Sequence, residues 1–219
     1  QKGAKTIVSI AGNSVEEYGK IAERLRDIPG VIGIEVNISC PNVENRGLVF
    51  ACDPNSAAEV IYSVKRNSTS SLPIFAKLSP DVTDISQIAK VVVNAGADGL
   101  SVINTLLGMV IDTKTLKPKL SGKTGGLSGP AIRPVAIRCV YQIRQALPKI
   151  PIIGMGGIRN GNDALEFFAA GANAISVGTM VFNDPEACVR IHDEVSELLH
   201  EKSIRSIKDV VNAAHKEEI

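Results

Sequence analysis

The chain lacks tryptophan, and only 4% of its 219 residues are aromatic. Proteins that bind single-stranded nucleic acid stack bases on aromatic side chains, so this composition disfavours such a surface. The net charge of +1 likewise gives no reason to expect nucleic acid or an anionic membrane as a partner. No apolar run has the length of a membrane span, and no signal-peptide pattern is visible. The composition is ordinary for a soluble globular enzyme, and we expect a cytoplasmic protein.

The cysteines are few and form no Cys-x-x-Cys pair. They are Cys40, Cys52, Cys139 and Cys188. Structural zinc sites and iron–sulfur clusters need closely spaced ligands, so we expect no metal site within this chain and a reducing compartment. Cys139 and Cys188 lie in helical patterns, and we interpret both as buried, inert thiols.

Short runs rich in valine and isoleucine alternate with amphipathic segments. The apolar runs are Thr6–Ala11, Ile34–Ser39, Ile74–Leu78, Leu100–Asn104, Pro151–Met155 and Ala174–Val177. The segments with helical spacing are Ser14–Leu25, Ser56–Lys65, Asp84–Ala95, Ala131–Leu147, Asn162–Ala170 and Pro185–Leu199. Continuous apolar strands that alternate with helices are typical of a parallel sheet covered by helices.

Two architectures fit such a sheet, an open doubly wound sheet and a closed barrel. The polar residues and glycines that follow nearly every strand distinguish between them. An open doubly wound sheet concentrates its site at one switch point, whereas a TIM (β/α)8 barrel collects residues from many strand ends. We favour the barrel, with six of its eight βα units present. Because a strand pattern begins almost at Gln1 without an initiator methionine, we expect one N-terminally truncated domain spanning residues 1–219.

Three features of the last two thirds of the chain carry further expectations. The connection from Asn104 to Pro151 is unusually long, holds a turn at Asp112–Lys114 between short strands, and has the size of a functional insertion. The arginines of residues 133–144 are interpreted as one solvated face of a helix. The histidines are interpreted as surface residues; they are His192, His200 and His215.

Paired glycines follow the last two strands. Gly156 and Gly157 end the fifth strand pattern, and Gly178 and Thr179 end the sixth. Glycine lets the backbone approach a ligand, and turns after the last two strands of such barrels commonly bind phosphate. The alternative is a pair of tight turns without a ligand.

Charged and amide side chains occupy other strand ends. Lys77 lies within an apolar strand, where a cation needs an anionic ligand or a structural salt bridge. Asn37 and Asn104 suit a planar heterocycle with donors and acceptors, or they are simple caps. Cys40 and Asn42 follow Asn37 in the loop, where a thiol can act as a base or can be inert. A phosphate-binding barrel without a redox cofactor, such as an aldolase or isomerase with a Schiff base at Lys77, therefore stays open.

Together these motifs resemble class 1B dihydroorotate dehydrogenase, the FMN-bearing catalytic subunit. The segment Asn37–Val43 is similar to the family's base loop, and Ala76–Pro80 is similar to its flavin-lysine strand. The later motifs match in order and approximate spacing; they are Ile103–Thr105, Gly125–Pro130, Gly154–Gly157 and Ser176–Thr179. Class 1A and dihydropyrimidine dehydrogenases are related alternatives, and a third alternative is an inactive barrel fragment.

The resemblance implies a role for each of these residues. Cys40 would remove the C5 proton of (S)-dihydroorotate, and the C6 hydride would pass to FMN, which yields orotate for pyrimidine (UMP) biosynthesis. The pyrimidine-binding residues would be Asn37, Asn42, Asn104 and Thr105. The flavin-binding residues would be Ser9, Asn37, Lys77, Ile103, Gly129, Gly156, Gly157, Gly178 and Thr179.

The resemblance also implies partners, and it shows two departures. The family's catalytic chains form a homodimer with an iron–sulfur subunit, a heterotetramer in which FAD and a 2Fe–2S cluster pass electrons to NAD+. At Ser9 the family commonly has asparagine, so Ser9 is expected to be a weak flavin contact. The family segment that precedes Thr6 supplies the first strands and further ligand contacts, so these 219 residues alone are expected to be inactive.

Overall fold

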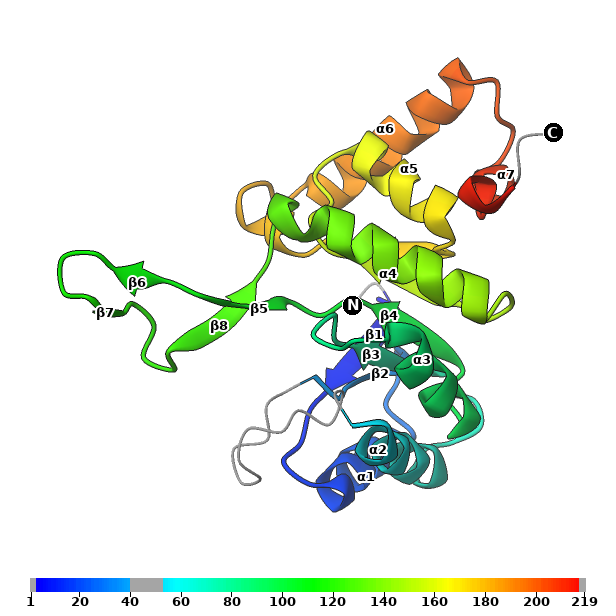
Figure 1. Cartoon of the computed structure of the whole chain (residues 1–219). Coiled ribbons are helices and arrows are strands. Elements are labelled where there is room, and N and C mark those ends of the chain that lie inside the picture. Colours follow the sequence, from blue (N-terminus) through cyan, green and yellow to red (C-terminus); the bar gives the residue numbers. More distant parts are fainter. Residues whose placement is uncertain (1–2, 40–52, 217–219) are drawn as a thin grey trace.

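The protein is built around one six-stranded parallel sheet (Figure 1). The computed structural model describes residues 3–39 and 53–216. The sheet strands are β1 (Thr6–Ile10), β2 (Val31–Asn37), β3 (Ile74–Leu78), β4 (Gly99–Val102), β9 (Ile152–Met155) and β10 (Ala174–Ser176). The α-helices are α1 (Val15–Arg24), α2 (Pro54–Asn67), α3 (Ile85–Asn94), α4 (Arg133–Ala146), α5 (Gly161–Ala170), α6 (Ala187–Glu201) and α7 (Ile207–Val210). Short 3-10 helices are Pro130–Ile132, Thr179–Phe182 and Ala213–His215.

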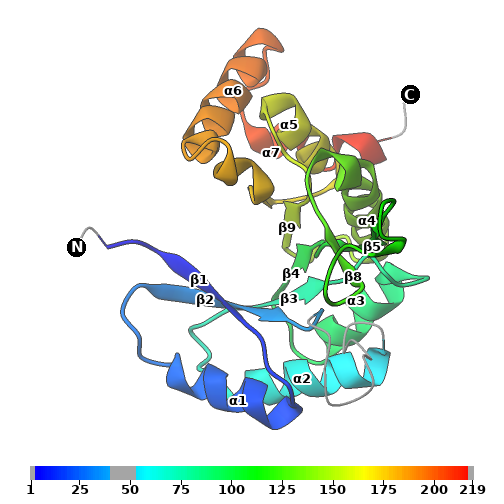
Figure 2. The same ribbon diagram turned by 90° about the vertical axis from the view of Figure 1, so that its left-hand side faces the viewer.

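The strands pair in the order β1-β2-β3-β4-β9-β10, and every pair is parallel. They follow a curve, and the helices line its outer side (Figure 2). Helices α1 to α6 contact one another in chain order around this curve. The structure thereby confirms the six predicted strand–helix units and the curled sheet of an incomplete barrel.

Side-chain alternation along the strands separates an apolar outer face from a polar inner face. In β2, Ile34 and Val36 are fully buried, while Glu35 and Asn37 are half-buried. The same pattern recurs in β3, where Lys77 is half-buried between two buried positions. Successive side chains of a strand point to opposite faces, so the buried set packs against the helices. Glu35, Asn37 and Lys77 therefore share the concave face.

Helix boundaries follow capping rules with one correction. The Asp84 carboxylate accepts from the backbone N–H of Ser86 at 2.8 Å, which confirms the predicted start of α3. The predicted start of the next helical segment at Asn162 is wrong, because the Asn160 side chain accepts from the backbone N–H of Asp163 at 2.9 Å and caps α5, which begins at Gly161. Gly171 has a φ of +119° at the end of α5, a conformation that favours glycine.

The long connection forms an arm that projects from the sheet (Figure 1). Strands β5 (Leu106–Met109) and β8 (Thr124–Leu127) pair antiparallel at its base. Strands β6 (Ile111–Asp112) and β7 (Lys117–Pro118) form the tip, which confirms the predicted turn between short strands. Within residues 3–39 and 53–216, no helix has the length and apolarity needed to cross a bilayer.

Three interpretations of individual side chains need correction. Cys188 is exposed, whereas Cys139 is buried, and burial raises the pKa of the Cys139 thiol as expected of an inert one. His215 is half-buried, stacks on Tyr141 with ring centroids 4.0 Å apart, and bonds the Ala170 carbonyl at 2.9 Å. It is therefore a packing residue rather than a surface residue.

The third correction concerns Arg144, which lies in the interior and not on a solvated helix face. Its guanidinium donates to the carbonyls of Gly171 at 2.8 Å and Pro148 at 2.7 Å, and to Asn173 Oδ1 at 2.8 Å. The same Asn173 oxygen accepts from Ile152 N–H at 3.0 Å. A planar guanidinium can satisfy several fixed acceptors at once, so Arg144 joins the ends of α4, α5 and β9.

We predict that Arg144→Met destabilises the fold, because several buried carbonyls lose their donor. The expected decrease in the free energy of unfolding is about 3 kcal/mol. The matched control is Arg138→Met on the exposed side of α4, where Arg138 bonds Gln142 at 2.7 Å. The control should stay within about 0.5 kcal/mol of the parent. Urea denaturation followed by circular dichroism measures both, and equal stabilities would contradict the assignment.

Candidate functional site

The carboxyl ends of β3, β4, β9 and β10 meet around a cavity of about 190 Å³. Parallel strands place all of their carboxyl ends at one edge, so residues distant in sequence become neighbours there. The cavity is lined by Lys77, Ile103, Asn104, Thr105, Ser128, Gly129, Ile132, Met155, Gly156, Gly157, Ser176, Gly178 and Thr179. The predicted lysine, amide and glycine motifs therefore lie on one rim.

The two predicted asparagines are in direct contact. Asn104 Nδ2 donates to Asn37 Oδ1 at 3.1 Å, and Asn104 Oδ1 accepts from Thr105 N–H at 2.8 Å. The backbone of Ser39 donates to the same Asn37 oxygen at 3.2 Å. The Asn37 oxygen thus already accepts two hydrogen bonds, so the amide N–H groups are what Asn37 has left to offer a ligand. Asn37 contacts the cavity residue Asn104 but does not itself line the cavity.

Lys77 is paired with an acid that the sequence reasoning missed. Its Nζ lies 3.2 Å from Glu35 Oε1, and the exposed Ser9 donates its Oγ hydrogen to the same oxygen at 2.8 Å. Lys77 therefore both forms the salt bridge that the sequence allowed and lines the cavity. The signal in the sequence was an acid two residues before Asn37, which puts Glu35 and Asn37 on one strand face.

The glycine turns shape the other end of the rim. Gly156 and Gly157 have φ values of +132° and +76°, and a Cβ on Gly157 would lie 2.6 Å from the Gly129 carbonyl oxygen. An adjoining cavity of about 160 Å³ shares Gly129, Gly157, Gly178 and Thr179 and includes Arg159. Arg159 adds a cation at this end, and sequence reasoning missed it although it follows Gly157 by two residues.

A buried carboxylate fixes the turn that carries Arg159. Asp163 is buried and forms ion pairs with both Arg133 and Arg159. It also accepts from the backbone N–H of Arg159 at 2.9 Å, while Arg133 lies 3.2 Å from Glu166. Charge-assisted bonds to a buried carboxylate restrain both cations, so the loop after β9 is held against the start of α4.

Three further candidates are not among the described residues that line the cavity. Ser9 lies on β1, where its hydroxyl is engaged by Glu35 rather than lining the cavity. Cys40 and Asn42 lie outside the described residues. Among residues 3–39 and 53–216, no group of three or more His, Cys, Asp or Glu side chains could hold a metal ion.

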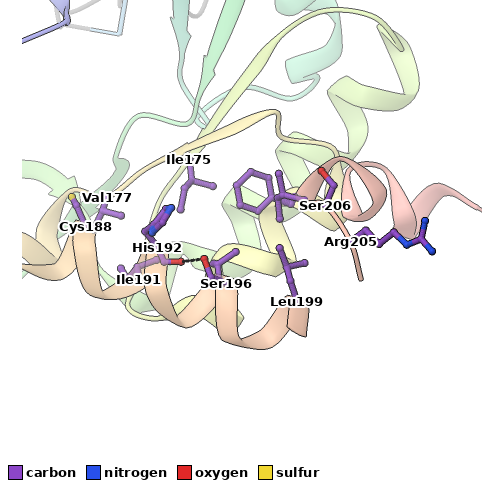
Figure 3. A pocket seen from close by; sticks show the side chains of 12 residues that line it. Ile175, Val177, Cys188, Ile191, His192, Ser196, Leu199, Arg205 and Ser206 are labelled. Carbon is purple, nitrogen blue, oxygen red and sulfur yellow. Dashed lines mark hydrogen bonds between the residues drawn. The ribbon is translucent and has the colours of Figure 1, made fainter. Parts of the chain in front are cut away.

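A larger, apolar cavity of about 430 Å³ lies elsewhere, between β10, α5, α6 and α7 (Figure 3). Its wall includes Cys188 and His192 on α6 and Ile175 on β10. None of the predicted site residues within the described ranges lines it. Polar groups that could orient a ligand are concentrated at the strand-end rim instead, so that rim is the candidate site.

Comparison with known proteins gives one consistent family. A family model described as dihydroorotate dehydrogenase matches residues 1–199. Two curated proteins named dihydroorotate dehydrogenase B (NAD(+)), catalytic subunit, are similar. The protein from Citrifermentans bemidjiense is 53% identical over 207 residues, covering 94% of this chain and 67% of the relative. The protein from Desulforamulus reducens is 56% identical over 209 residues, covering 95% and 68%.

A solved structure shares the fold. The chain superposes on the dihydroorotate dehydrogenase of Eimeria tenella, solved in complex with ferulenol, with a TM-score of 0.77 and 23% sequence identity. The match covers 94% of this chain and 60% of that structure. The chain thus spans about two thirds of the length of the two curated relatives and about three fifths of the solved structure.

We predict that Gly157→Ala destabilises the rim, because it strains a positive φ and brings a methyl group against the Gly129 carbonyl. A loss of at least about 2 kcal/mol in unfolding free energy is expected. Gly122→Ala in the arm is the control, since its new Cβ would make only ordinary contact at 3.5 Å. Thermal and urea unfolding of both variants measure the difference. Unchanged stability of Gly157→Ala would show that the turn adapts freely.

Proposed function

The chain belongs to the dihydroorotate dehydrogenase family, and we propose that its strand-end rim binds FMN and oxidises (S)-dihydroorotate to orotate in pyrimidine biosynthesis. The convergence of Lys77, Asn104 and the glycine turns on one cavity is the observation that carries this proposal. The match to catalytic subunits named for NAD+ favours class 1B over class 1A or dihydropyrimidine dehydrogenases. The aldolase or isomerase alternative has no support from these comparisons.

The residues of the rim fit an elongated flavin. A Cβ at Gly129 or Gly178 would meet no atom within 4 Å, so open space adjoins both glycines where the two cavities join. Ser101 is fully buried, pairs in register with Lys77, and has no hydrogen-bond partner for its hydroxyl among the described residues. Lys77, Ile103 and Asn37 would hold the ring of the flavin. Ser9 would act on this end only indirectly, through its hydrogen bond to Glu35. The phosphate would lie at the end formed by Gly156, Gly157, Gly178 and Thr179.

Binding and proton transfer are the work of this chain's residues. When bound, the flavin supplies the acceptor for the hydride that leaves C6 of the substrate. Asn37, Asn42, Asn104 and Thr105 orient the pyrimidine through amide and hydroxyl hydrogen bonds. Cys40 would remove the proton from C5 of the substrate, and the Lys77 ammonium would stabilise negative charge on the flavin ring.

The name "catalytic subunit" of the relatives points to a partner subunit. We assign to that partner the FAD and 2Fe–2S cluster that pass electrons to NAD+, in a heterotetramer built on a homodimer of catalytic chains. Residues 1–219 form part of a single barrel domain in this proposal, and the whole enzyme acts in the cytoplasm. The activity belongs to the full-length protein.

We predict that Cys40→Ser in the full-length, flavin-loaded protein slows flavin reduction by dihydroorotate about 10²–10⁴-fold, the usual contribution of a positioned base. Flavin content should be unchanged, because the thiol takes no part in holding the cofactor. Cys188→Ser is the control, since Cys188 is exposed and lines the other cavity. Stopped-flow absorbance measures reduction. A parental rate in Cys40→Ser would remove Cys40 from the mechanism.

A further inference from the structure

Glu35 is a carboxylate on the concave face of the sheet, beneath the rim. Its side chain is 13% exposed, and that of Lys77 is 20% exposed. A single oxygen, Oε1, accepts from Lys77 Nζ at 3.2 Å and from Ser9 Oγ at 2.8 Å. A half-buried charge is costly without a partner, so each of the two ions accounts for the other.

Strand register explains why these three side chains meet. Ser9 on β1 pairs with Glu35 on β2, so they are lateral neighbours on one face. Lys77 on β3 pairs with Asn37 on β2 and with Ser101 on β4, both of them uncharged. Glu35 lies two residues before Asn37 on the same face, one step deeper than the row that Lys77 occupies. Lys77 therefore forms its ion pair with Glu35, which lies one row deeper on the same face.

The ion pair holds the Lys77 ammonium in place and offsets part of its positive charge. The wall of the cavity at the strand ends includes Lys77 but not Glu35, and Glu35 Oε1 lies 3.2 Å from the Lys77 ammonium. Ser9 fixes the carboxylate oxygen from the β1 side, which limits how far Glu35 can follow Lys77. Charges near a flavin ring tune its electronic properties, and their effect is strong in a partly buried site.

We propose that Glu35 is a positioning residue that holds Lys77 against the flavin ring, partly neutralises it, and thereby lowers the reduction potential of the bound flavin. This inference rests on the proposed function for the flavin itself. Lys77 alone would favour the reduced, more negative ring. Glu35 offsets that preference, so the reduced flavin can pass its electrons onward.

The first test compares the affinities of oxidised and reduced FMN for the full-length protein. Glu35→Gln keeps an oxygen for Ser9 and Lys77 and removes the negative charge. The ratio of the dissociation constants, oxidised over reduced, should rise about tenfold, which is about 30 mV upward for a two-electron couple. Glu16→Gln is the matched control, because Glu16 pairs with Lys20 on the exposed face of α1. A purely structural carboxylate would leave the ratio unchanged, and that result would overturn the proposal.

The second test needs no flavin. Acetylation of Lys77 in the flavin-free, full-length protein is followed by mass spectrometry, with exposed Lys90 as internal reference. Loss of one charge-assisted bond of about 1.5 kcal/mol in Glu35→Ala should raise the relative rate about tenfold. An unchanged rate would show that Glu35 does not hold Lys77. A faster rate in a protein that binds no FMN would leave the positioning role standing and would contradict the proposed function instead.

Discussion

Parallel pairing of six strands in one direction is the constraint on which the site depends. It places the carboxyl ends of β3, β4, β9 and β10 at one edge, and every one of them contributes to the same cavity. Lys77 and Thr179 are distant in sequence but line one space because their strands run the same way. The curvature of the sheet then gives a concave face on which alternate residues, Glu35 and Asn37 among them, can stay polar.

Much of this arrangement could be predicted because its signals are local. Runs of branched apolar residues marked the strands, and glycines and asparagines marked the strand ends. The strand of Lys77 was predicted with the bounds that the structure has, Ile74–Leu78. The arm could also be predicted, because the turn expected at Asp112–Lys114 overlaps the turn at residues 113–116 that joins β6 to β7. The direction of a strand or helix and its hydrophobic period depend on residues that are close together in the sequence.

The errors concern contacts between distant residues. Arg144 was assigned to a solvated helix face, yet it is buried against carbonyls of the α5–β10 turn, which adjoins α4 only after folding. Cys188 was assigned to the interior, although α6 exposes it. Glu35 was missed because its role depends on an ion pair with Lys77 of the neighbouring strand, and the sequence does not show which residues pair. Hydrophobic periodicity carries no information on such partners.

In the proposed complex, one rim holds the ring of the flavin at Lys77 and its phosphate at the glycine turns. A crystal structure of the full-length protein with FMN and orotate would locate both ends of the flavin. We expect electron density for the flavin ring against Lys77 and Ile103, with the phosphate beside Gly157 and Gly178. Density for FMN in the apolar cavity between α5, α6 and α7, or at the amino ends of the strands, would contradict it.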